Sequence, residues 1–123
     1  MKKIRKIDGS CAPLALKYLS KKSDKTVYDV CLINWFQQSH GMEEHEFLNA
    51  AKALGIRLRR INLKKIGLYR SKLSKFIKNN PKGTYLIYTH AHIFVIDNGL
   101  VIDKLNPKYL GMSRMVTGAW KCG

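Results

Sequence analysis

The sequence contains no long hydrophobic run. None of its apolar stretches approaches the roughly 20 residues needed to span a bilayer, which predicts a protein without a transmembrane helix. A signal peptide is not expected either, because the basic start, residues 1–6, is followed by Asp8, Gly9 and Ser10 where an apolar segment would have to stand. These absences predict a cytoplasmic protein that does not act at a membrane.

Acidic residues are scarce. The chain has 8 Asp and Glu against 23 Lys and Arg, for a formal net charge of +15 at pH 7. Such a field attracts nucleic acid, acidic proteins and other polyanions, but it also simply keeps a protein soluble. Charge alone therefore names no partner. The apolar share of 46% is that of an ordinary globular protein and argues against strong disorder.

Cysteine is rare, and its spacing does not suit a metal. The three cysteines form no CxxC pair and no Cys/His pair with zinc spacing, so no metal and no other cofactor is expected. Their odd number excludes a dense disulfide framework. Cys31 falls on an apolar helical face and is expected in the core. Cys122 lies near the end of the chain and is given no specific role.

The 123 residues fit a single domain. Periodicity and turn signals predict an α+β fold, with N-terminal helices packed on one side of a small antiparallel sheet. The core is expected at about residues 8–105, and residues 106–123 show too little pattern to be assigned. The expected helices are residues 11–21, 24–38, 42–54 and 71–79, and the expected strands are residues 56–63, 84–89, 92–97 and 100–103.

Cys11 stands in the first turn of a predicted helix, directly after a Gly-Ser turn. A helix N-terminus supplies about half a positive charge and free backbone N–H groups, which stabilise a thiolate. The position therefore favours a nucleophilic thiol. The alternative is a small buried residue that happens to begin a helix.

His92 opens an apolar strand, an uncommon place for an imidazole because its ring needs polar partners when buried. With residues 98–99 as a two-residue hairpin loop, Asp97 faces Leu100. Continuing this register puts Asp103 on the face of His92, as its diagonal neighbour at about 7–8 Å, within reach of a hydrogen bond. A shift of one residue would move Asp103 to the other face. The alternative is an ordinary histidine at a strand end.

The chain has three other histidines that are candidates for the base. His90 has the same strand parity as His92 and competes with it, but lies further from Asp103 along the hairpin. His40 and His45 lie on or beside the third predicted helix and are expected to face solvent. His92 is therefore preferred.

Three segments, in this order, resemble the papain-like cysteine peptidases: DGSCAPLAL at 8–16, GMEEHEFLNAAKALGI at 41–56 and HIFVIDNGLVID at 92–103. The chain is similar to the minimal double-glycine-leader peptidases and to small proteins of tailed phages with a DGSC start. DGSC also resembles the DGxC start of ovarian-tumour-type deubiquitinases. The resemblance implies a papain-like fold, a phage origin, and a hydrolase that cleaves a peptide or isopeptide bond of a polypeptide substrate. It makes Cys11 the nucleophile, His92 the base and Asp103 the orienting acid.

The chain departs from the papain-like pattern at one position. These enzymes usually carry a Gln before the nucleophile as an oxyanion donor, whereas no Gln precedes Cys11, and Arg5 and Lys6 stand in this region. Oxyanion support is therefore assigned to the loop that holds Asp8 and Ser10, together with the backbone N–H of Cys11.

A second hypothesis keeps the fold but makes the basic surface functional. The protein would then be weakly active or inactive, and would bind nucleic acid or an acidic host or virion protein. Tyr69 and Tyr88 lie among basic segments and could stack on bases; the alternative is a merely solvated basic face. The candidate contacts are Arg57, Arg59, Lys72, Lys75 and Lys78. A third hypothesis is an assembly component that docks through residues 106–123.

Overall fold

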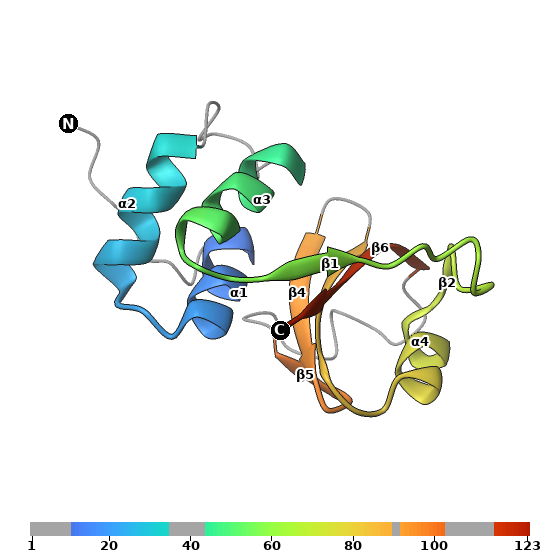
Figure 1. Ribbon diagram of the computed structural model, residues 1–123. Coiled ribbons are helices and arrows are strands. Elements are labelled where there is room, and N and C mark those ends of the chain that lie inside the picture. Colours follow the sequence, from blue (N-terminus) through green and yellow to red (C-terminus); the bar gives the residue numbers. More distant parts are fainter. Residues whose placement is uncertain (1–10, 35–43, 90–91, 103–114) are drawn as a thin grey trace.

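The computed structural model describes residues 11–34, 44–89, 92–102 and 115–123 (Figure 1). This part of the chain has an α+β fold with four helices and a six-stranded antiparallel sheet. The helices are α1 (Cys11–Ser20), α2 (Asp24–Asn34), α3 (Glu44–Ala53) and α4 (Leu73–Asn79). The strands are β1 (Leu58–Arg60), β2 (Ser71–Lys72), β3 (Thr84–Thr89), β4 (His92–Asp97), β5 (Leu100–Ile102) and β6 (Met115–Cys122).

The strand order of the sheet is β1-β6-β3-β4-β5, and β2 also pairs with β6. The unassigned end of the sequence thus contains a central strand. Its alternation is hidden because both faces of β6 are covered: Trp120 packs in one core cluster, Val116 and Ala119 in another. A register shift against β3 near Thr89 breaks the pattern further.

Helices cover both faces of the sheet (Figure 1). On one face α1, α2 and α3 form a core with Ile93, Val95 and Trp120. On the other face Phe76 of α4 packs with Phe94. The expectation that all helices lie on one side is therefore wrong for α4. Its seven residues bury only Leu73 and Phe76, too short a stripe for sequence periodicity to show which face it covers.

The hairpin of β4 and β5 forms as predicted. Asn98 and Gly99 both have positive φ, 50° and 81°, as a type I′ turn requires. Asp97 lies opposite Leu100, and Val95 lies opposite Ile102. The register on which the Asp103 assignment depends is thus confirmed as far as Ile102.

Several element boundaries differ from the sequence prediction. Only Leu58–Arg60 of residues 56–63 forms a strand, because Leu63 turns inward to anchor a loop. Ser71 and Lys72 extend to pair with β6 instead of beginning the helix. Strands β3 and β4 have the predicted bounds.

The central place of β6 predicts unequal effects for two adjacent residues. Trp120 is 2% exposed and makes a T-shaped contact with Phe47, ring centroids 5.3 Å apart. Trp120→Ala should lower the free energy of unfolding by about 3–5 kcal/mol. Lys121→Ala, on the exposed neighbour, should change it by no more than about 0.5 kcal/mol. Urea denaturation measures both; similar small losses would contradict a buried β6.

Candidate active site

The described part of helix α1 spans Cys11–Ser20, within the helix predicted over residues 11–21. Ala12, Ala15 and Leu16 are buried against the sheet, which fixes the helix in place. Its first turn contains no acidic side chain, so the positive end of the helix dipole is not offset from within this turn. The backbone of Cys11 therefore stands where a thiolate is stabilised.

One hydrogen bond defines the direction of α1 relative to the sheet. The Tyr18 hydroxyl, near the end of α1, donates to Asp97 Oδ2, at the end of β4, over 2.6 Å. Because α1 packs along β4, the two elements run in the same direction. Along the helix axis, Cys11 lies about 10 Å before Tyr18, and along the strand His92 lies about 16 Å before Asp97. The start of α1 and the start of β4 therefore lie at the same end of the sheet.

Asp97 takes a structural role in this arrangement. The Tyr18 hydroxyl, and secondly the Thr84 hydroxyl at 3.0 Å, hold the pKa of Asp97 below its ordinary value. The same bond to Asp97 raises the pKa of Tyr18. Asp97 is thus an ionised acceptor that locks helix to strand.

His92 is half-buried, and its ring stacks on Phe94 with centroids 5.6 Å apart and planes 28° apart. Phe94 belongs to the core cluster on the α4 side, whereas Ile93 faces α1. The imidazole thus lies on the sheet face opposite α1, at the first residue of β4. The elements that carry Cys11 and His92 thus start at the same end of the sheet, but the His92 ring lies on the face that α1 does not cover.

The other predicted site residues are placed only in part. Asp103, Asp8, Ser10 and the competitors His90 and His40 lie outside the described residues. His45 is exposed on α3, as expected. Of Cys11, His92 and Asp103, the structure thus describes the backbone of Cys11 and the position of His92.

The other two cysteines are unsuited to nucleophilic chemistry. Cys31 is completely buried, as predicted, and burial raises the pKa of its thiol to about 12. Burial likewise raises the pKa of Cys122 to about 11; Cys122 pairs with Leu58 across β6 and β1. Both thiols are therefore protonated at neutral pH, where the thiolate is the reactive form.

The predicted basic contacts are all exposed. Arg59 lies opposite Lys121 on β1 and β6, while Lys75 and Lys78 lie on α4 and Lys72 precedes it in β2. Arg57 is exposed before β1. The three lysines therefore do not all lie on one helix: Lys72 ends β2, and Lys75 and Lys78 lie one turn apart on α4.

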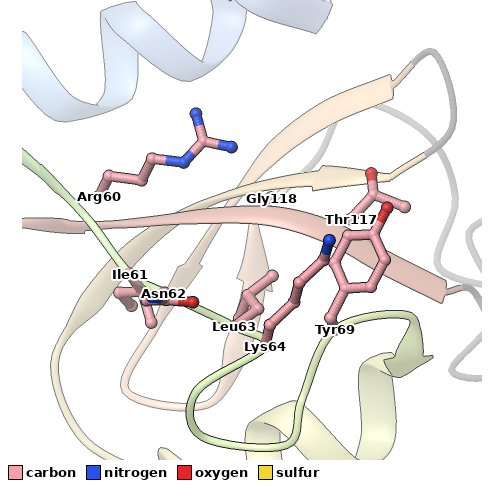
Figure 2. A pocket seen from close by; sticks show the side chains of 8 residues that line it. All are labelled: Arg60, Ile61, Asn62, Leu63, Lys64, Tyr69, Thr117 and Gly118. Carbon is pink, nitrogen blue, oxygen red and sulfur yellow. The ribbon is translucent and has the colours of Figure 1, made fainter.

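Sequence reasoning missed a pocket beside β6. Arg60 lines it on one side, Lys64 and Tyr69 on another, and Thr117 and Gly118 form its wall (Figure 2). Of the residues that line it, the sequence singled out Tyr69, because this tyrosine lies among basic segments. Their convergence depends on pairing with β6, which no local pattern indicated.

Among the described residues, no three His, Cys, Asp or Glu side chains are grouped so as to hold a metal ion. In the same part of the chain no helix is long and apolar enough to cross a membrane. Comparison with protein-family models, curated proteins and solved structures finds no match to this chain.

The bond between Tyr18 and Asp97 predicts a measurable titration. Tyr18→Phe removes the main cause of the lowered pKa, so the pKa of Asp97 should rise toward its ordinary value, while the bond from Thr84 remains. Since folding lowers this pKa, ionised Asp97 stabilises the fold above about pH 4, and this contribution is lost as the pH falls through the folded pKa. The stability difference between variant and wild type should therefore shrink in acid.

NMR titration of the Asp97 carboxyl carbon measures the first effect, and urea denaturation at two pH values measures the second. Tyr69→Phe is the matched control, because it removes a hydroxyl from the loop before β2 and should leave the pKa of Asp97 unchanged. An unchanged Asp97 titration in Tyr18→Phe would mean that the bond does not form in solution.

Proposed function

We propose that this protein is a papain-like cysteine hydrolase that cleaves a peptide or isopeptide bond, with Cys11 as nucleophile, His92 as base and Asp103 as orienting acid. The observation that carries the proposal is the common direction of α1 and β4. It brings the start of the Cys11 helix and His92, which are 81 positions apart in the sequence, to one end of the sheet. The proposal is thus supported by the position of two backbone segments at one end of the sheet, while the His92 ring itself faces the side opposite α1.

The reaction needs an ion pair of thiolate and imidazolium. The Cys11 thiolate attacks the substrate carbonyl, and the His92 imidazolium gives its proton to the leaving amine as the C–N bond breaks. Water then attacks the thioester and gives one proton to His92 as the C–S bond breaks, which releases a carboxylic acid and restores the pair of Cys11 thiolate and His92 imidazolium. Backbone N–H groups at the start of α1 stabilise the oxyanion.

The position of the His92 ring sets a requirement on this mechanism. The ring stacks on Phe94, so it has to turn around the end of β4 toward α1 when substrate binds. Losing a ring contact of this kind costs about 0.5–1.5 kcal/mol. Because a strand residue points its side chain to one face, this turn also requires a change of the backbone at His92, which lies opposite Thr89.

The proposal also rests on the state of the other thiols. Burial raises the pKa values of Cys31 and Cys122, which leaves Cys11 as the cysteine at a position that favours a thiolate. A reactive thiol in this protein is thus attributed to Cys11.

Thiol labelling tests the nucleophile. At pH 6 a cysteine with the ordinary pKa of about 8.5 is almost entirely protonated. Cys11 in the folded protein should react with iodoacetamide at least about tenfold faster at this pH than the same cysteine in urea. Mass spectrometry of the labelled peptides should show little modification of Cys31 and Cys122.

Matched histidine variants test the base. His92→Ala should lower the labelling rate of Cys11 at pH 6 toward that of a free thiol, because the thiolate loses its cationic partner. His45→Ala removes an exposed histidine from α3 and should leave the rate unchanged. The hydrolase proposal fails if Cys11 reacts no faster than a free thiol, or if both variants behave alike.

A further inference from the structure

The pocket beside β6 arises from a gap in the sheet. β1 pairs with β6 at Arg60–Trp120, and β2 pairs with it at Ser71–Val116. Between these pairs the chain leaves the edge of β6 and returns, so Thr117 and Gly118 face a cavity of about 380 Å³ instead of a strand. Ligand sites for small molecules start at about 300 Å³, so the cavity can hold a group of nucleotide size.

The loop that encloses the cavity is built rigidly. Its ends are tied to β6, since the Ile61 N–H donates to the Ala119 carbonyl at 2.9 Å and the Arg70 N–H to the Val116 carbonyl at 2.8 Å. Within the loop, the Leu68 N–H donates to the carbonyl of Leu63 at 2.8 Å, and both leucines are buried. The side chains that the loop presents are therefore held on a fixed frame.

Those side chains are two cations around an exposed aromatic ring. Tyr69 is 41% exposed, with Lys64 Nζ 5.1 Å and Arg70 Cζ 5.6 Å from its ring centroid. Figure 2 shows Lys64 and Tyr69 side by side, with Arg60 across the cavity. Arg60 is held over the Trp120 ring and by Glu44, 2.7 Å away. Lys64 and Arg70 both lie over the Tyr69 ring, so a base that stacks on Tyr69 takes the place of one of these exposed side chains, and the displaced cation is then free to contact the phosphate.

The segment that encloses the cavity carries charge of one sign, and Glu44 of α3, which pairs with Arg60, adds one acidic side chain beside it. All 8 acidic residues lie outside residues 47–96, the segment that forms β1, the loop, β2, α4, β3 and most of β4. A ligand with a single carboxylate would pair with one cation, whereas the successive phosphates of a nucleic acid can pair with many. The basic residues of the segment are Lys52, Arg57, Arg59, Arg60, Lys64, Lys65, Arg70, Lys72, Lys75, Lys78 and Lys82.

We propose that this pocket binds single-stranded nucleic acid: one base stacks on Tyr69, its phosphate contacts Lys64 and Arg60, and neighbouring phosphates follow the basic side chains of residues 47–96. A single strand fits better than a duplex because its bases are free to stack in a pocket of this size. This site is separate from the proposed hydrolase centre and does not depend on it.

Fluorescence anisotropy with a labelled oligothymidylate of about 12 nucleotides tests the proposal, since OB-type sites cover about 4–16 nucleotides. Affinity should fall steeply between about 50 and 200 mM salt. Tyr69→Ala should weaken binding roughly ten- to a hundredfold, while Tyr69→Phe keeps the ring and most of the affinity. Lys64→Ala should reduce the steepness of the salt dependence by about one phosphate contact.

Lys22→Ala is the matched charge control, because it removes one exposed cation between α1 and α2, away from the pocket; it should leave affinity nearly unchanged. Cys11→Ala should bind as the wild type does. Loss of affinity confined to the Tyr69 and Lys64 variants supports the site. Equal losses in Lys22→Ala, equal affinity for poly-glutamate, or duplex binding that is insensitive to Tyr69→Ala would each overturn it.

Discussion

The backbone pairing of β6 with β3 joins the two sides of the sheet, and the rest of the fold depends on it. Leu86 lies opposite Trp120 within this ladder. One edge of β6 carries β1 and β2, while β3 leads to β4 and β5. Both core clusters include residues from β6 and β3, so the helical layer and α4 are held by the same hydrogen bonds. Without this ladder, α1 would pack on β3, β4 and β5 alone, and the core on its side of the sheet would lose Trp120.

The same ladder relates the candidate active site to the basic pocket. His92 lies opposite Thr89, and Thr89 lies opposite Val116, next to the pocket wall. Two strand spacings, about 10 Å, therefore separate His92 from that wall across the sheet. Both features lie at one end of the sheet, while the Tyr18–Asp97 bond secures the other end. A ligand longer than a few residues could reach both.

Local signals in the sequence predicted much of this arrangement. Cys11 was placed at a helix start by its turn and cap, and the hairpin register followed from Asn98 and Gly99, whose positive φ few other residues accept. β6 could not be predicted, because its environment comes from strands remote in sequence and a register shift masks its alternation. The pocket was missed for the same reason. The alternation of side chains in the hairpin predicted that His92 and Phe94 share a face of the sheet. It could not predict that α1 covers the opposite face, because that depends on how the helices pack.

The position of β6 also has a consequence for the order of assembly. A strand that is made after all the others lies between β1 and β3. During synthesis, the edges of β1, β2 and β3 therefore stay unpaired until residues 115–122 emerge, and unpaired edges invite association with other chains. The contacts that complete the sheet link Leu58 with Cys122, far apart in the sequence, and such contacts slow folding. Translation speed near the end of this segment thus sets how long the nascent chain is exposed to aggregation.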